Sequence, residues 1–312
     1  MSAGGAVAVA ARTLFDIVRN LPEGDVTFAV DGNHTCEIRG GKVRYKIPGL
    51  ATDDFPPLPN PGDAEFFDLD VEVVGDLISK TAFSMSSDDT RPHLAGALFE
   101  GEGSTLRMVT TDGHRLSKVE RQVEGASFSF SMLVPNKGVT ELKRLLEDPK
   151  PAKGEEARVA VATAGANAFF RRDGGQLNVK LADEQFPPYD KVIPAEHTRR
   201  VVAAREGMVE ALRRIALVSN EKSGGVRLQL DPGVLHITSE NPDIGEGSED
   251  LDVDYAGDAV TIGFNARYLL DALGALSTDE VVLELSGELD PGVVRPVGGP
   301  ADFIGVVMPM RI

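Results

Sequence analysis

Hydrophobic residues recur along this chain with two periods, and each period predicts one kind of element. Five stretches carry apolar residues three or four positions apart, which is typical of helices that bury one face. Short runs of strict apolar–polar alternation lie between them and predict half-buried antiparallel strands. The expected helices span residues 9–21, 71–85, 136–147, 204–220 and 265–276. The expected strands include residues 26–30, 43–47, 105–110, 128–132, 158–162, 226–230, 281–285 and 303–307.

The same arrangement occurs about three times. Residues 50–57 and 181–188 both begin with Leu-Ala and end with Phe-Pro-Pro. The pattern at 9–21 returns at 134–146 and once more at 264–276. A period this long indicates duplicated domains, because solenoid repeats are only roughly 20–50 residues long. Each repeat is expected to be an α+β unit of about two helices and eight strands, with helices on one face of antiparallel sheets.

The repeats divide the 312 residues into three expected domains, 1–62, 63–197 and 198–312. In the middle repeat one helix begins near Val71 and the other near Val134, so a long stretch of strands separates them. In the first repeat the helix expected at Val9 stands almost at the start of the sequence, with no such stretch before it. The first domain is therefore expected to lack about half of its length, on the order of 55–60 residues by comparison with the other repeats. Unpaired strand edges should then make residues 1–60 less stable than the rest.

Composition places the chain among soluble globular proteins, with 42% apolar and 26% charged residues. No apolar run is long enough to span a membrane, and the apolar start lacks the basic region of a signal peptide. Cys36 is the single cysteine, so no intramolecular disulfide can form and the expected location is the reducing cytoplasm. Five scattered histidines leave no metal-ligand cluster, and no cofactor is expected.

The net charge of −17, taken alone, speaks against nucleic-acid binding, but its distribution matters more. The five predicted helices together carry +2, which leaves −19 for the strands and loops. The helices are thus the part of the chain that an anionic polymer can approach. The alternative is an ordinary solvated surface. The basic residues expected on the exposed helix faces are Arg12, Arg19, Lys80, Lys137, Arg144, Arg213, Arg214 and Arg267.

Catalysis has little support. Asp112 and His114 resemble an acid–base pair, but they lie at the end of a strand and in a turn, with no Ser or Cys nucleophile motif. An Asp-Gly turn with a structural histidine is the better interpretation. The glycine-rich segments lack the strand–loop–Lys-Ser/Thr layout of a phosphate-binding loop. ATP-driven steps would therefore need a separate protein.

Seven motifs follow one another in a fixed order. They are Arg91 to Glu100, Thr111-Asp-Gly-His-Arg-Leu116, Val134 to Gly138, Phe186-Pro-Pro-Tyr189, Ser219 to Lys222 with Val226 to Leu228, Gly263 to Asn265, and Val306-Val-Met-Pro-Met-Arg-Ile312. They cover essentially the whole chain, and seven in order are very specific. On these motifs the chain closely resembles the β subunit of bacterial DNA polymerase III, the sliding-clamp family.

The resemblance implies three similar domains per subunit and two subunits joined head to tail as a ring. Helices would line the hole and sheets would form the outside. Such a clamp encircles duplex DNA without sequence preference and tethers DNA polymerase subunits, and a clamp-loader ATPase also binds it. It is a non-catalytic accessory subunit. Contacts to phosphates would weaken with salt.

The resemblance also implies a pocket between the second and third domains that binds short partner peptides. The Met-Pro-Met sequence near the end suits it, because proline cannot continue a ladder and methionine adapts to varied apolar ligands. His93 and Lys191 stand where relatives carry other residues, which puts peptide preference in doubt. The matching pocket residues are Leu94, Thr111, Gly113, His114, Arg115, Leu116, Pro187, Lys191, Val192, Tyr268, Val306, Val307, Met308, Pro309, Met310 and Arg311.

Ring closure in the family implies a dimer interface with Tyr45 and Ile47 on one side and Leu217 and Val218 on the other. The last two fall on the polar side of their helix, which suits an interface, although they could equally cap the helix against a strand. Two other classes stay open. One is a clamp-like paralogue or truncated product that binds peptides without closing a ring. The other, more distant, is an enzyme on the same scaffold.

Overall fold

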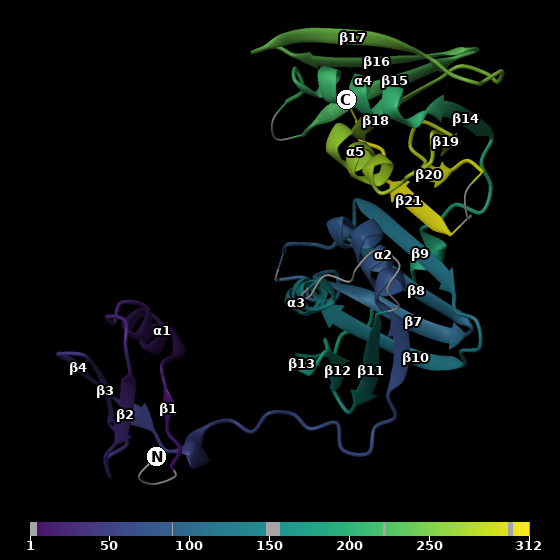
Figure 1. Ribbon diagram of the computed structural model, residues 1–312. Coiled ribbons are helices and arrows are strands. Elements are labelled where there is room, and N and C mark those ends of the chain that lie inside the picture. Colours follow the sequence, from purple (N-terminus) through teal and green to yellow (C-terminus); the bar gives the residue numbers. More distant parts are fainter. Residues whose placement is uncertain (1–4, 89, 148–156, 221–222, 299–301, 312) are drawn as a thin grey trace. The chain divides into compact units, whose positions relative to one another are not determined.

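The computed structural model describes residues 5–88, 90–147, 157–220, 223–298 and 302–311. The chain forms two compact units, Met1–Asn60 and Pro61–Ile312 (Figure 1). All five predicted helices are present, each within its expected range: α1 (Ala11–Arg19), α2 (Val71–Thr81), α3 (Asn136–Glu147), α4 (Arg205–Ala216) and α5 (Ala266–Gly274).

Local chemistry explains where helices begin and end. Asp70 caps α2 by accepting from the backbone N–H of Glu72, and Asn265 caps α5 by accepting from those of Arg267 and Tyr268. The expected extension of α2 to residue 85 is wrong, because Ala82–Ser84 tighten into a 3-10 turn. Helix ends commonly do so, since the last carbonyls need nearer partners.

The first unit contains α1 and two small sheets. Strands β2 (Val26–Val30), β3 (Cys36–Gly40) and β4 (Val43–Ile47) form one sheet in that order, and β1 (Ala8–Val9) pairs with β5 (Gly49–Leu50). Its core consists of Ile17, Cys36, Ile38 and Ile47. Val18 has the helical spacing of the apolar stripe that includes Ile17, yet its side chain is exposed. Phe15 and Phe28 are also exposed, at 62% and 52%, so much apolar surface in this unit is uncovered.

Among the described residues, the second unit contains two repeats with the same order of α-helices and strands, each with two α-helices and eight strands, as predicted. The central repeat holds α2 and α3 with β6 (Phe67–Asp70), β7 (Gly96–Gly103), β8 (Thr105–Thr111), β9 (Arg115–Gln122), β10 (Phe128–Pro135), β11 (Arg158–Ala164), β12 (Asn167–Arg172) and β13 (Gly175–Lys180). The C-terminal repeat holds α4 and α5 with β14 (Arg199–Ala204), β15 (Gly225–Asp231), β16 (Val234–Asn241), β17 (Gly245–Asp252), β18 (Val260–Asn265), β19 (Glu280–Leu285), β20 (Gly292–Pro296) and β21 (Phe303–Val307).

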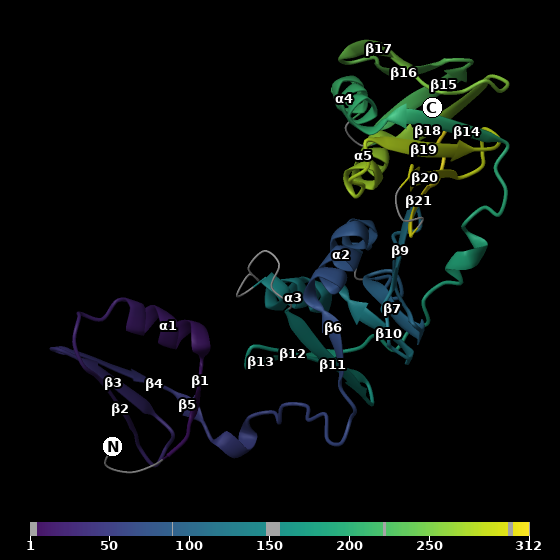
Figure 2. The ribbon, with the colours of Figure 1, turned by 45° about the vertical axis from the view of Figure 1, so that its right-hand side comes forward.

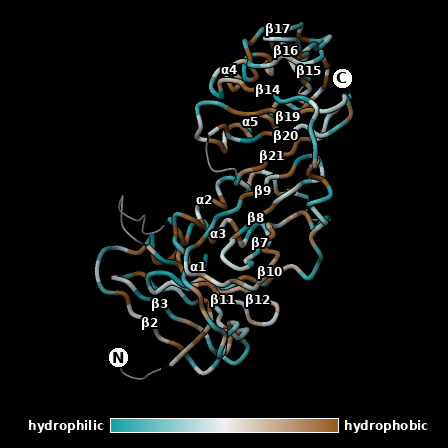
Figure 3. The backbone as a smooth tube through the Cα atoms, turned by 90° about the vertical axis from the view of Figure 1, so that its right-hand side faces the viewer, coloured by the Kyte–Doolittle hydropathy of each residue, from teal (hydrophilic) through white to brown (hydrophobic). Residues whose placement is uncertain are grey.

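One antiparallel sheet runs through both repeats, in the order β10-β7-β8-β9-β21-β20-β19-β14. The joint is the β9–β21 pair, in which Val119 lies opposite Phe303 and Arg115 lies opposite Val307. Each repeat adds a four-stranded sheet, β13-β12-β11-β6 in the first and β17-β16-β15-β18 in the second. The alternation of hydropathy along these strands can be followed in Figure 3.

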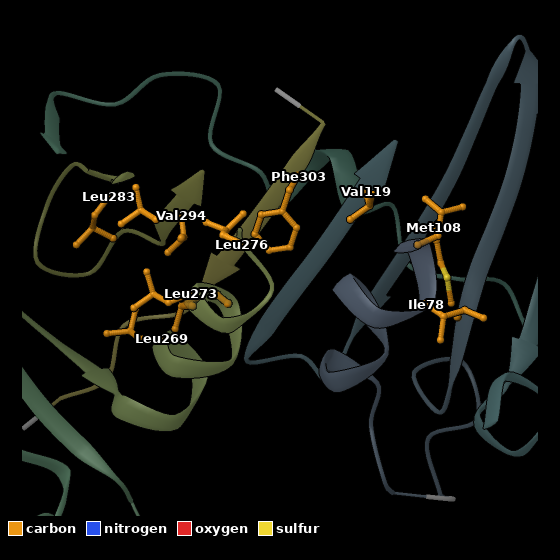
Figure 4. Close-up of a cluster of buried hydrophobic side chains, with 14 of the residues drawn as sticks. Ile78, Met108, Val119, Leu269, Leu273, Leu276, Leu283, Val294 and Phe303 are labelled. Atoms are coloured by element: carbon orange, nitrogen blue, oxygen red, sulfur yellow. The ribbon is translucent and has the colours of Figure 1, made fainter. Parts of the chain in front are cut away.

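The four helices of this unit lie on one side of the sheets (Figure 2). Each helix buries the apolar face that its spacing of three or four residues predicts: Val139, Leu142 and Leu146 of α3 and Met208 and Leu212 of α4 are buried. The core continues across the joint, where Phe303 of one repeat and Val119 of the other belong to the same cluster (Figure 4). Burial of such apolar surface is the main stabilising term and fixes the two repeats as one body. No helix among the described residues is long and apolar enough to cross a membrane.

Candidate partner-peptide site and DNA-facing helices

The turn between β8 and β9 is organised by Asp112. Its carboxylate accepts from the backbone N–H groups of His114 and Arg115, at 2.9 and 3.0 Å. Gly113 adopts a φ of +90°, which glycine tolerates best. The carboxylate is therefore occupied by the turn itself. This geometry supports the interpretation of residues 112–114 as a structural turn rather than an acid–base pair.

Arg115 ties the two repeats together. Its side chain is only 10% exposed and donates to Asp112 at 3.1 Å and to Asp271 of α5 at 2.5 Å. The guanidinium also lies over the rings of Phe83 and Tyr268, at 5.5 and 4.5 Å from their centroids. A planar, always charged guanidinium suits such a double role. Arg115 and Tyr268 were both expected in the peptide pocket, and the structure brings them into direct contact with each other.

The segment after β21 returns to this turn. Met308 donates its backbone N–H to the carbonyl of His114 at 2.8 Å, and Met310 donates to Gly263 at 2.9 Å. Pro309, between them, has no N–H to donate. The side chain of Met308 is exposed beside the turn, whereas that of Met310 is half-buried and lines a cavity of about 360 Å³ together with Arg311. The predicted Met-Pro-Met segment is therefore held at both methionines and presents apolar surface.

The other expected pocket residues divide by burial. Four belong to the interior and contribute by packing rather than by direct surface contact: Leu94, Leu116, Val306 and Val307. Thr111 is also buried, and its hydroxyl donates to the carbonyl of Arg115. Pro187 lines a second cavity, of about 410 Å³. The exposed members are Gly113, His114, Lys191, Val192, Met308 and Arg311.

Sequence reasoning missed a polar network beneath this site. The hydroxyl of Tyr189 donates to Glu100 at 3.1 Å and accepts from Arg107 at 3.3 Å. Burial and the neighbouring carboxylate raise the pKa of Tyr189 to about 12, so the phenol stays protonated. Glu120 also accepts from Arg107, which with Lys118 holds the pKa of that carboxyl below its usual value despite burial. The Phe186-Pro-Pro-Tyr189 motif was the available signal, but it does not reveal partners that lie far away in the sequence.

The eight basic residues expected to face DNA are not equivalent. Lys80 is 20% exposed and is paired with Asp76 at 3.0 Å. Arg214 lies between Glu210 and Glu249, which raise the pKa of its guanidinium and offset its charge. Arg144 is paired with Glu141 at 2.7 Å. In the described ranges no ion pair involves the remaining five, all exposed: Arg12, Arg19, Lys137, Arg213 and Arg267.

The expected interface residues also differ in accessibility. Leu217 is 78% exposed and Tyr45 is exposed. Ile47 is instead part of the core of the first unit. Val218 is half-buried and packs close to Gly247 of β17. One residue of each expected pair therefore remains available for contact with a partner.

Tandem repeats with helices on one face and antiparallel sheets on the other define the class of DNA clamps. The family models of three domains of the DNA polymerase III beta subunit match this chain: the N-terminal domain over residues 1–59, the central domain over 68–188 and the C-terminal domain over 190–311. The chain belongs to this family of non-catalytic beta sliding clamps.

Comparison with individual relatives gives the same family. The chain is 39% identical over 310 residues to the beta sliding clamp of Proteus mirabilis, covering 99% of this chain and 82% of that protein. It superposes on the DNA polymerase III subunit beta of Pseudomonas aeruginosa with a TM-score of 0.87 and 35% identity, covering 98% and 83% of the two chains. For a Caulobacter crescentus beta sliding clamp the TM-score is 0.89 at 32% identity, covering 100% and 83%.

These matches favour a sliding clamp over the clamp-like paralogue or enzyme. The expectation that about half of the first domain is lacking is not borne out: the N-terminal domain description fits residues 1–59, and 99% of the chain aligns with its relatives.

Proposed function

We propose that this chain is a sliding clamp that encircles duplex DNA, with its helices toward the DNA and its sheets outward. The observation that carries this proposal is the position of the basic residues. Lys137, Arg213 and Arg267 are exposed, unpaired among the described residues, and lie on three helices of one face. Phosphate contacts from such residues position DNA without reading its sequence. Arg12 and Arg19 on α1 are proposed to act in the same way, whereas Lys80, Arg144 and Arg214 contribute less because carboxylates already pair with them.

We further propose that partner peptides from polymerase subunits and a clamp loader dock beside the turn at residues 112–114. The apolar surface of Val192, Met308 and Met310 would receive apolar side chains, with His114 and Lys191 at the rim. The buried residues of the expected pocket support this surface from beneath.

The proposed place of action is the cytoplasm. The proposed domain boundaries are 1–62, 63–197 and 198–312.

Ring closure is proposed to occur through a head-to-tail homodimer, with β4 of one subunit beside β17 of the other. Charge supports the pairing. Arg44 and Lys46 of β4 share the single carboxylate of Glu37, so the strand keeps positive charge. The acidic residues of β17 are Glu246, Glu249, Asp250 and Asp252, of which Glu249 is already paired with Arg214. Tyr45 and Leu217 would supply exposed apolar contacts near these edges. Complementary charge favours correct docking and speeds association.

Size-exclusion chromatography with light scattering tests closure: we expect a dimer of about twice 33.3 kDa. A stable monomer would instead favour the peptide-binding clamp that forms no ring.

Retention on DNA tests the orientation of the helices. After loading onto circular plasmid, the triple variant Lys137→Glu, Arg213→Glu, Arg267→Glu should dissociate from the DNA faster, by about tenfold or more. The three substitutions change the charge by six units and replace attraction to the phosphates with repulsion. The matched control changes three exposed strand cations by the same charge: Lys180→Glu, Arg200→Glu, Arg227→Glu. Equally fast loss of both variants from the DNA would contradict the proposed orientation of the helices.

A further inference from the structure

A groove of about 410 Å³ lies next to the proposed peptide site and is not explained by it. Its walls are β7, the edge strand β10 and the connecting segment 181–190 (Figure 1). We call it the acidic groove. It contains Pro187, which the resemblance assigns to the peptide pocket, and its volume is within the range of ordinary ligand sites.

The floor of the acidic groove is apolar and firmly held. Leu98, Leu133 and Phe186 line it, are almost fully buried and belong to one core cluster. One wall is a sheet edge, because β10 is the last strand of the eight-stranded sheet. The connecting segment reaches this edge through a hydrogen bond from Ala182 N–H to the carbonyl of Leu133, at 3.0 Å. An extended chain or a long aliphatic side chain fits such a surface.

The rim carries negative charge. Glu100, Glu184 and Asp190 line the groove, and no Lys or Arg is among its lining residues. Glu100 is partly offset by Arg107, which lies directly opposite it on the neighbouring strand β8, 3.4 Å away. Glu184 and Asp190 are exposed, and within the described part of the chain no ion pair involves either of them. Two available carboxylates above an apolar floor complement a side chain with an aliphatic stem and a cationic end, which is the chemistry of Lys and Arg.

We propose that the acidic groove binds basic residues that flank the apolar docking motif of a partner peptide, and so helps to select among partners. The inference rests on the proposed peptide site and extends it. The two sites adjoin along the chain, because the short 3-10 helix Tyr189–Lys191 begins among the groove residues and leads directly to Val192 of the proposed docking surface. An extended peptide advances about 3.3 Å per residue, so a few residues suffice to pass from one site to the other.

Fluorescence anisotropy with the full-length chain tests the proposal. The probes are fluorescein-labelled synthetic peptides that share an apolar Leu-Phe pair, chosen to fill the apolar surface of Val192, Met308 and Met310. One carries two flanking alanines, and two others carry a Lys pair before or after the motif. We expect one Lys peptide to bind roughly three- to tenfold more tightly than the alanine peptide, as suits two partly exposed ion pairs. The double variant Glu184→Gln, Asp190→Asn should remove this advantage and leave alanine-peptide binding unchanged. Asp183→Asn, an exposed neighbour outside the groove lining, is the matched control.

The outcomes separate the two proposals. If the alanine peptide binds but neither Lys peptide gains, or if the gain survives in the double variant, the acidic groove does not bind basic residues. If Asp183→Asn removes the gain equally, the effect comes from general surface charge and the inference is also overturned. If no peptide binds the wild-type chain, the peptide site itself is wrong, and the inference fails with it.

Discussion

At the scale of single residues, Arg115 shows what a sequence can and cannot reveal. The Asp-Gly turn before it is predictable, because the turn depends on residues a few positions apart. Its ion pair with Asp271 joins residues 156 positions apart, and no local pattern encodes that. The resemblance assigned Arg115 to the peptide pocket, whereas its contacts with Phe83, Tyr268 and Asp271 make it primarily a joint between the two repeats.

Arg115→Ala should therefore lower the free energy of unfolding by about 3–5 kcal/mol, because it leaves mostly buried partners without their cation. Arg115→Lys should lower the free energy of unfolding by a smaller amount. It keeps the positive charge, but an ammonium cannot satisfy two carboxylates and two rings at once. Urea denaturation followed by circular dichroism measures both. The control Arg267→Ala, at an exposed helix position without a described ion pair, should change stability by less than about 0.5 kcal/mol. An Arg115→Ala variant as stable as this control would contradict the assigned role.

At the scale of elements, periodicity located each α-helix of the described residues and each of the strands named from the sequence, because these elements bury one face and the pattern records it. It could not give the pairing of β9 with β21. Register between distant strands depends on tertiary packing, and the segment after β21 is positioned only by that pairing. Its two backbone hydrogen bonds, from Met308 and Met310, lie beyond the last strand.

Deleting residues 308–312 should therefore abolish binding of the Leu-Phe peptides and leave the fold largely intact. The loss of two backbone hydrogen bonds costs about 1–3 kcal/mol of unfolding free energy. Peptide affinity is read by fluorescence anisotropy and the fold by circular dichroism. Deleting only residue 312 keeps both hydrogen bonds and every residue of the expected pocket, and serves as the control. Unchanged peptide affinity in the longer deletion would refute the assigned site.

At the scale of the whole molecule, the two compact units differ in how much core they share. The core of the first unit contains four buried side chains, whereas the repeats of the second unit share one extensive cluster across their joint. The sequence indicated three related repeats, but not that two of them form one body, because the shared cluster depends on the β9–β21 pairing. Exposed apolar residues such as Phe15 and Phe28 further limit burial in the first unit.

Hydrogen exchange should consequently find the first unit the less protected one. Opening free energy follows the apolar surface that an element buries, and α1 buries a single residue, Ile17, whereas α5 buries Ala266, Leu269, Ala272 and Leu273. Both helices have nine residues, so they form a matched pair. We expect the amides of α1 to exchange at least tenfold faster than those of α5 at the same pH and temperature, which corresponds to about 1.4 kcal/mol in opening free energy. Measurement by mass spectrometry on the full-length chain, at concentrations below and above dimer formation, distinguishes intrinsic stability from protection by a partner. Equal protection of α1 and α5 at the lower concentration would show that the small core stabilises the first unit as well as the large core stabilises the second. The predicted order of stability would then be wrong.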